Sequence, residues 1–294
     1  MKPDPKRNLF SVIGYSYVSI LSIVCFVPFW LIISGSFSSE SSIVKKGYSI
    51  IPGQFSFKAY ETLFRYSDRI VSAYTVTVAL TVLGTFLGLF LMAMAAFVLL
   101  RQDFKYRNYF AFFFYFTLLF SGGLVPFYLL MVGYLELKNT FLSMLLPSMM
   151  SAWNLLLLRN FMKNVPESII ESAKIDGAGD FTIFMRFIVP LSKSGLATIG
   201  LFVALVYWND WFNAMLFIDD MNLYPLQYLL YKTIQQVEGL QMASQKGAAV
   251  SLAELPAESI KMATAVISTG PILLVFPFIQ KYFVKGIVVG SVKG

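Results

Sequence analysis

Six stretches of this chain carry no charged side chain. They cover residues 8–39, 70–100, 108–135, 139–158, 194–209 and 262–280. A helix needs about 20 mostly apolar residues to cross the roughly 30 Å hydrocarbon core of a bilayer, and most of these stretches reach that length. The chain is 57% hydrophobic and only 13% charged, whereas soluble domains have about 25% charged residues. We therefore predict an all-α membrane protein.

The predicted architecture is one transmembrane domain, 1–294, with six membrane helices. The fifth uncharged stretch is interrupted at Asp210, but apolar sequence resumes and continues to Ile218. With that extension, the predicted spans are 14–37, 71–99, 108–132, 141–162, 194–218 and 260–282.

Several kinds of chemistry are excluded by composition. The chain has no histidine, so it has no imidazole base, Ser-His-Asp triad or His-ligated metal. Its single cysteine, Cys25, cannot form an intrachain disulfide or a CxxC pair. No phosphate-binding G-x-x-x-x-G-K-[ST] motif occurs. We expect no catalytic residue, metal or cofactor in this chain, and we do not expect it to be an enzyme.

The net charge of +7 is best explained by membrane topology rather than by nucleic acid. Lys and Arg are denser in segments 1–13, 101–107, 159–193 and 281–294 than in the remaining loops, and cytoplasmic loops carry such an excess. Both termini are therefore predicted to be cytoplasmic. The polar segments 38–70 and 219–259 are predicted to lie outside, and Pro225 is predicted to start a helix within the second.

A polar stretch, 164–190, separates two apolar runs and reads as two short amphipathic helices joined at glycines. Asn164 and Glu167 have the spacing of a capping box. Gly177 and Gly179 suit a helix end, because glycine accepts the left-handed conformation. Asp180 is predicted to cap the second helix. Without a partner, this unit would be only a membrane-surface loop.

The same stretch resembles the EAA loop of bacterial ABC importer permeases, whose pattern is E-A-A-x3-G-x9-I-x-L-P. The match rests on Glu171, Ala173, Gly177 and Pro190, with Ser172, Phe187 and Val189 as substitutions. The segment "KIDGAGDFTIF", which contains Asp176, and the tail 276–294 are similar to the oligosaccharide branch. The tail also resembles permeases for uronate-containing sugars, although neutral sugars fit as well.

The resemblance implies a mechanism and partners. The loop would be a coupling helix that sits in a groove of a separate ATP-hydrolysing subunit, through Glu171, Ser172, Ala173, Asp176, Gly177 and Pro190. Two such subunits would bind ATP and Mg²⁺, so this chain would need no cofactor. A second, homologous permease would complete the pathway as a heterodimer in the bacterial cell membrane, and an extracytoplasmic binding protein would deliver the sugar.

Candidate sugar contacts lie in two spans, because sugar sites combine aromatic faces with amides and carboxylates. At helical spacing Tyr207, Asp210 and Asn213 share one face, and intramembrane charges normally face protein or water. The full candidate set is Tyr207, Trp208, Asn209, Asp210, Asn213, Trp153 and Asn154. The alternative is an ordinary aromatic belt or subunit packing.

A different functional class also stays open. A secondary transporter driven by an ion gradient would also be a multi-pass helical protein, but it would need buried acids or broken helices deep in its spans. Only Asp210 qualifies among the acids. Co-purification of an ATPase separates the two classes.

Overall fold

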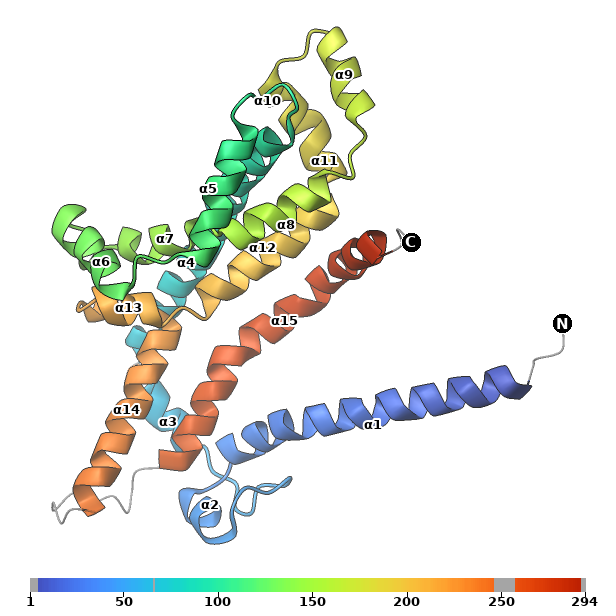
Figure 1. Cartoon of the computed structure of the whole chain (residues 1–294). Helices are drawn as coiled ribbons and strands as arrows, with labels where there is room; N and C mark the ends of the chain where they lie inside the picture. Colours follow the sequence, from blue (N-terminus) through green and yellow to red (C-terminus); the bar gives the residue numbers. More distant parts are fainter. Residues whose placement is uncertain (1–4, 66, 246–256, 292–294) are drawn as a thin grey trace. The chain divides into compact units, whose positions relative to one another are not determined.

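The computed structural model describes residues 5–65, 67–245 and 257–291, and these are helical throughout apart from loops (Figure 1). An isolated antiparallel β-bridge joins Ser38 and Phe55 in the loops on either side of α2. The elements are α1 (Pro5–Ser36), α2 (Glu40–Lys46), α3 (Lys58–Phe64), α4 (Ser67–Leu100), α5 (Arg107–Leu119), α6 (Leu124–Leu129), η1 (Leu130–Tyr134), α7 (Phe141–Met149), α8 (Ala152–Met162), α9 (Glu167–Ile175), α10 (Asp180–Ile183), η2 (Phe184–Ile188), α11 (Val189–Leu191), α12 (Lys193–Trp208), α13 (Phe212–Phe217), η3 (Met221–Leu223), α14 (Leu226–Gln245) and α15 (Ala257–Ser291).

The chain divides into two compact units. One comprises 1–67 and 232–271, and the other comprises 68–231 and 272–294. In the first unit, the carboxylate of Glu40 accepts hydrogen bonds from the backbone N–H groups of Glu258 and Ser259 at 3.0–3.2 Å. These N–H groups open α15 and have no partner inside the helix, so Glu40 supplies one.

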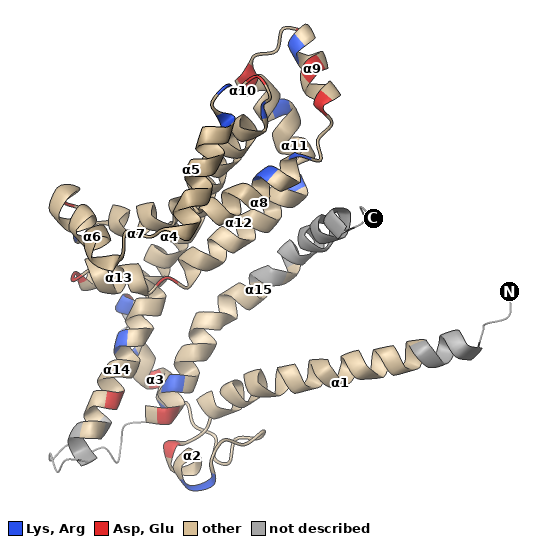
Figure 2. Ribbon diagram, viewed as in Figure 1, with Lys and Arg blue, Asp and Glu red and all other residues tan. Residues whose placement is uncertain are grey.

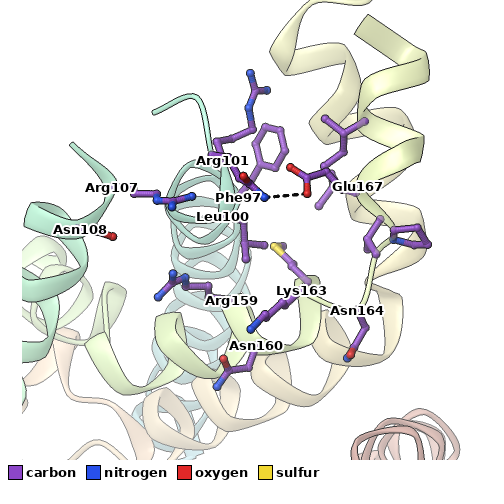
Figure 3. A pocket seen from close by; sticks show the side chains of 16 residues that line it. Phe97, Leu100, Arg101, Arg107, Asn108, Arg159, Asn160, Lys163, Asn164 and Glu167 are labelled. Carbon is purple, nitrogen blue, oxygen red and sulfur yellow. Dashed lines mark hydrogen bonds between the residues drawn. The ribbon is translucent and has the colours of Figure 1, made fainter. Parts of the chain in front are cut away.

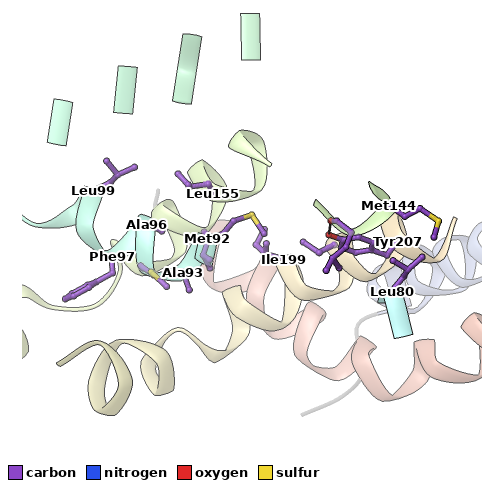
Figure 4. Packing of buried hydrophobic residues seen from close by; sticks show 14 of the residues in the cluster. Leu80, Met92, Ala93, Ala96, Phe97, Leu99, Met144, Leu155, Ile199 and Tyr207 are labelled. Atoms are coloured by element: carbon purple, nitrogen blue, oxygen red, sulfur yellow. Dashed lines mark hydrogen bonds between the residues drawn. The ribbon is translucent and has the colours of Figure 1, made fainter. Parts of the chain in front are cut away.

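The second unit holds a large buried apolar cluster (Figure 4). Within it, α8 packs against both α5 and α12, and α7 packs against α13. Tyr207 on α12 is 1% exposed and donates its hydroxyl to the carbonyl oxygen of Leu145 at 2.6 Å. Its ring lies against Gly84 of α4, where an added Cβ would come within 2.3 Å of it. A glycine is therefore what lets these two helices approach so closely.

Two described helices are long and apolar enough to cross a bilayer, Ser11–Ser36 and Asp68–Leu100, and they overlap the first two predicted spans. The number of candidate spans among the described residues rises to five if three bent helix pairs each count as one. The last predicted span, 260–282, lies within α15.

Three predicted spans are not continuous helices. Span 108–132 breaks at 120–123 with a bend of 114°, and span 141–162 breaks at Met150–Ser151 with a bend of 48°. Gly123, at φ 90°, adopts a conformation that L residues rarely adopt, and Ser151 accepts a hydrogen bond from the N–H of Asn154 as a new N-cap. Each break therefore has a local cause, but the uncharged, apolar composition of the span does not predict where the helix breaks.

The third predicted span that is not a continuous helix is 194–218. α12 ends at Trp208 and α13 begins only at Phe212. Asp210 accepts hydrogen bonds from the backbone N–H of Asn213 at 3.1 Å and from its side-chain amide at 2.7 Å. The acid that interrupts the apolar run thus lies before α13, where it accepts from the first turn of that helix, and not within a continuous helix.

Candidate functional site

The predicted pair of short helices exists, at the end of the second unit that lies away from α13 (Figure 1). α9 ends at Ile175, and Gly177 follows in the left-handed conformation at φ 79°. The N–H of Gly177 bonds the carbonyl of Lys174, and the N–H of Ala178 bonds that of Ala173, both at 2.9 Å. This is a Schellman-type helix end, so the helix end predicted at Gly177 is confirmed, while its role in ATPase coupling stays a prediction.

The predicted caps at the two helix starts are wrong. The N-cap of α9 is Pro166, without a side-chain hydrogen bond, so Asn164 and Glu167 form no capping box. The Glu167 carboxylate instead accepts from the side-chain amide of Gln102 at 2.9 Å. Asp180 is the first residue of α10 rather than its cap, because its carboxylate is engaged elsewhere.

Ala173 does not face outward from this pair of helices. It is 4% exposed and belongs to the buried cluster of the chain itself. The side chains that do face outward include Ile175, which is 86% exposed, and Phe181, which is 61% exposed. At 3.6 residues per turn, Glu171, Ser172 and Ile175 share the exposed side of α9. Asp176, Gly177 and Pro190 are exposed as well.

An ion-pair network ties α9 and α10 to the turn after α4. The guanidinium of Arg101 donates from Nε to Asp103 at 2.7 Å and from Nη1 to Asp180 at 2.6 Å. Lys174 of α9 donates to Asp103 at 2.7 Å. The Arg101 side chain is only 12% exposed, and it lies over the ring of Phe97 at 5.6 Å. One arginine therefore joins the end of α4 to the start of α10.

The electrostatics of the network follow from these contacts. Hydrogen bonds from Arg101, and then from Lys174, hold the pKa of the Asp103 carboxyl well below its usual range. The hydrogen bond to Asp103 likewise raises the pKa of Arg101 further above its already high value. Asp103 and Arg101 therefore stay ionised at physiological pH. Figure 2 shows these charges gathered around α9–α11, whereas the middles of α5 and α12 are uncharged.

Segment 101–107 was predicted only to be one of the cytoplasmic segments rich in Lys and Arg, so the pairing of Arg101 and Asp103 with α9 and α10 was not predicted. The available signal was complementarity. A turn with Arg101 and Asp103 and a loop with Lys174 and Asp180 can satisfy each other once helix packing brings them together. Spacing within either segment alone gives no hint of the pairing.

The candidate sugar contacts are dispersed rather than gathered on one face. Tyr207 and Trp208 are buried, at 1% and 8% exposure, and so is Asn154, at 8%. Asn209 is exposed and donates its amide to the carbonyl of Leu205 at 2.8 Å. Trp153 is 61% exposed. Because the helix breaks after Trp208, the expected common face of Tyr207, Asp210 and Asn213 does not form, although Asp210 and Asn213 do contact each other.

Another aromatic pair lies beside the helix break. Trp211 stacks on Tyr231 of α14, with ring centroids 4.7 Å apart, and stays 38% exposed. The amide of Gln227, also on α14, reaches the side-chain oxygen of Asn209 at 3.4 Å. The predicted helix after Pro225 is confirmed as α14, and it supplies both neighbours. The rest of the predicted outer loop, 246–256, lies outside the described residues.

Long apolar helices and bent helix pairs are typical of a multi-pass membrane protein. Comparison with known proteins gives the family. Residues 15–289 match the binding-protein-dependent transport system inner membrane component family, and the chain belongs to it. The chain is thus an inner-membrane permease subunit of a binding-protein-dependent ABC transporter, and is not itself catalytic.

Individual relatives match over their full length. The polygalacturonan/rhamnogalacturonan transport system permease protein YtcP of Bacillus subtilis is 40% identical over 98% of this chain and 100% of its own length. The arabinooligosaccharides transport system permease protein AraQ of the same species is 24% identical over 100% of both chains. A chain in the crystal structure of a bacterial ABC transporter that imports the acidic polysaccharide alginate is 28% identical. It aligns with a TM-score of 0.79 over 96% of this chain and 99% of that chain.

Proposed function

We propose that this chain imports oligosaccharides, acidic ones in particular, and that α9 and α10 form its contact with a separate ATPase subunit. The relatives support the proposed substrate class, since one bears the name of a polygalacturonan/rhamnogalacturonan permease and another belongs to an alginate importer. The contact rests on the exposed apolar side chains Ile175 and Phe181, which stand on an anchored, charged unit outside the apolar helices.

The proposed assembly has two homologous permeases, two ATP-binding subunits and an extracytoplasmic sugar-binding protein. In this chain six spans would place both termini in the cytoplasm. Closure of the ATPase pair would push α9 and α10, and the Arg101 network would pass that displacement to α4 as a unit. Coupling of this kind needs a rigid connection, and the ion pairs supply one.

Exposure divides the candidate sugar contacts into two groups. Trp153 and Asn209 have exposed side chains that can meet a ligand, and we assign pathway contact to them together with Asp210 and Asn213. Tyr207, Trp208 and Asn154 are buried, and we assign to them packing that shapes the helix break. The Asp210 carboxylate is already engaged by Asn213, which reduces its repulsion of an acidic sugar.

The single observation that carries the coupling proposal is the exposure of Ile175, because an apolar side chain this exposed at a charged corner suits burial against a partner. Replacing Ile175 with Asp places an unpaired charge in that contact. We expect ATPase association to weaken roughly tenfold or more, with loss of ligand-stimulated hydrolysis. Pull-down of the ATPase subunit and hydrolysis in nanodiscs measure both.

The matched control is Ile51→Asp, since Ile51 is 77% exposed and lies in the segment predicted to be outside. This variant should assemble normally. Full association of the Ile175→Asp protein would contradict the proposed contact. Uptake that survives ATP depletion while an ion gradient persists would favour a secondary transporter instead.

A further inference from the structure

A basic cavity of about 580 Å³ opens beside α9, at the ends of α4 and α8 and the start of α5 (Figure 3). Four basic side chains line it, but Arg101 is engaged by Asp103 and Asp180. The other three are Arg107, Arg159 and Lys163. Within the described residues, these three side chains make no ion pair or hydrogen bond. The cavity thus presents positive charge that no described side chain neutralises.

The opposing negative charge in the cavity is small. Glu167 is its one lining carboxylate, and this group accepts a hydrogen bond from Gln102. Figure 3 shows Arg107 and Arg159 on the side of the cavity opposite Glu167. An anionic ligand between them would meet converging donors without displacing an existing ion pair.

The remaining walls identify the kind of anion. Beside the bases lie the apolar side chains of Phe97, Leu100, Met162, Ile170 and Ile188, and the amides of Asn108, Asn160 and Asn164. A small inorganic anion makes no favourable contact with an apolar wall, whereas the apolar part of a glycerolipid does. The amides suit a headgroup that carries hydroxyls. The cavity also lies where the apolar helix α4 ends, at the expected depth of lipid headgroups.

The surface next to the cavity can hold acyl chains. α5 begins at Arg107, on the cavity wall, and none of its residues is buried. Its exposed side chains include Tyr109, Phe110 and Phe113. An acyl chain lying along α5 would therefore leave its phosphate near Arg107.

We propose that this cavity binds the headgroup of an anionic phospholipid of the phosphatidylglycerol type, with the phosphate held by Arg107, Arg159 and Lys163. Basic pockets between membrane helices on the cytoplasmic side bind anionic headgroups in this way. Arginine suits the role because its planar fork matches a phosphate. The inference does not depend on the ATPase contact at Ile175, so the two can fail separately.

The test is a lipid titration of the full purified transporter, read by native mass spectrometry with short-chain phosphatidylglycerol. Each basic side chain near an anionic surface contributes about fivefold in affinity. The double variant Arg159→Gln/Lys163→Gln should therefore bind about 25-fold more weakly, and Arg159→Lys, which keeps the charge but not the planar fork, should bind with an intermediate affinity. Short-chain phosphatidylcholine should bind the unaltered transporter far less well.

The matched control removes the same charge elsewhere on the same side. Lys105→Gln/Arg186→Gln alters two basic residues that do not line the cavity, and it should change affinity less than twofold. An equal loss in the control would reduce the effect to general surface charge and overturn the proposal. Displacement of the lipid by millimolar inorganic phosphate would show a free-anion site. Stronger lipid binding once the ATPase subunits are removed would show that a protein covers the cavity.

Discussion

Arg101 is the residue on which the charged end of the second unit depends most. It is nearly buried, and it bonds two carboxylates that are far apart in sequence, Asp103 and Asp180. A lysine carries the same charge on a single ammonium group, which cannot reproduce the planar fork. The geometry, and not only the charge, is therefore what a substitution removes.

We expect Arg101→Lys to keep part of the coupling between sugar and ATP hydrolysis and Arg101→Gln to lose most of it. Basal hydrolysis should remain in both, because Arg101 lies outside the proposed ATPase contact. The measurement is the ratio of ligand-stimulated to basal hydrolysis in nanodiscs. Lys105→Gln, two residues from the network's Asp103, is the control. Identical ratios in all four proteins would show that the network only stabilises the fold.

The Asp103 carboxyl sets the pH range of this network. Its pKa is lowered in the folded chain by Arg101 and Lys174, so the stabilisation is present above the unfolded pKa of about 3.9 and is lost as pH falls through the folded pKa. Asp103→Asn should lower the midpoint of thermal unfolding by a constant amount between pH 8 and 5. Because Asp103 is half-exposed, the loss should be about 1 kcal/mol at most. If the difference in unfolding midpoint between the unaltered protein and Asp103→Asn already narrows between pH 7 and 5, this assignment is contradicted.

Among the elements, α4 approaches α12 and α7 closely at its glycines. Besides Gly84 against Tyr207, Gly88 of α4 lies so close to Met149 that an added Cβ would be 2.5 Å from its carbonyl oxygen. Membrane helices approach closely where such residues lie between them. The close approach of these helices therefore depends on glycine contacts, which a hydropathy pattern does not predict.

Gly84→Ala should destabilise the transporter by about 1–3 kcal/mol, because the new methyl group must displace the ring of Tyr207. Gly133→Ala is the matched control, since an added Cβ there meets nothing within 4 Å. Thermal unfolding in detergent, followed by tryptophan fluorescence, compares the two. Adding Tyr207→Ala should reduce the penalty of Gly84→Ala, and an unchanged penalty would assign the strain to another neighbour.

The elements also show what sequence could predict. Apolar length located α1 and α4, and Gly177 located the end of α9, because these depend on local composition or backbone conformation. The breaks at 120–123, Met150 and Asn209 were missed, since a broken span has the same hydropathy as an intact one. The resemblance gave Ala173 as part of the ATPase contact, but Ala173 is buried within the chain's own apolar cluster, because sequence does not show which segment covers a helix face.

At the scale of the whole molecule, the family and the permease role were predicted from a few positions of one loop. The EAA-like pattern is informative because its glycine and its buried small residue are fixed by geometry that the structure shows, at Gly177 and Ala173. The pairing of Arg101 with Asp180 joins residues 79 positions apart. Only the folded chain reveals such a contact, because neither segment contains the information alone.

The last prediction concerns orientation in the membrane, on which the coupling proposal depends. In a Cys25→Ala background, which removes the chain's single cysteine, a cysteine can be placed at Ile51 or at Ile175. Both positions are exposed on the chain itself, at 77% and 86%, so burial within the chain cannot explain a difference in labelling. Gly53 is a poorer choice, because an added Cβ would come within 2.3 Å of Ser42.

An impermeant thiol reagent applied to intact cells should label Ile51→Cys and leave Ile175→Cys unlabelled. After the membrane is permeabilised and the ATPase subunits are stripped from it, both should react at similar rates, which controls for the reactivity of each site. The expected result places 38–70 outside and α9 in the cytoplasm, where ATPase subunits can reach it. Labelling of Ile175→Cys in intact cells would put α9 on the wrong side of the membrane and remove the physical basis of coupling to ATP hydrolysis.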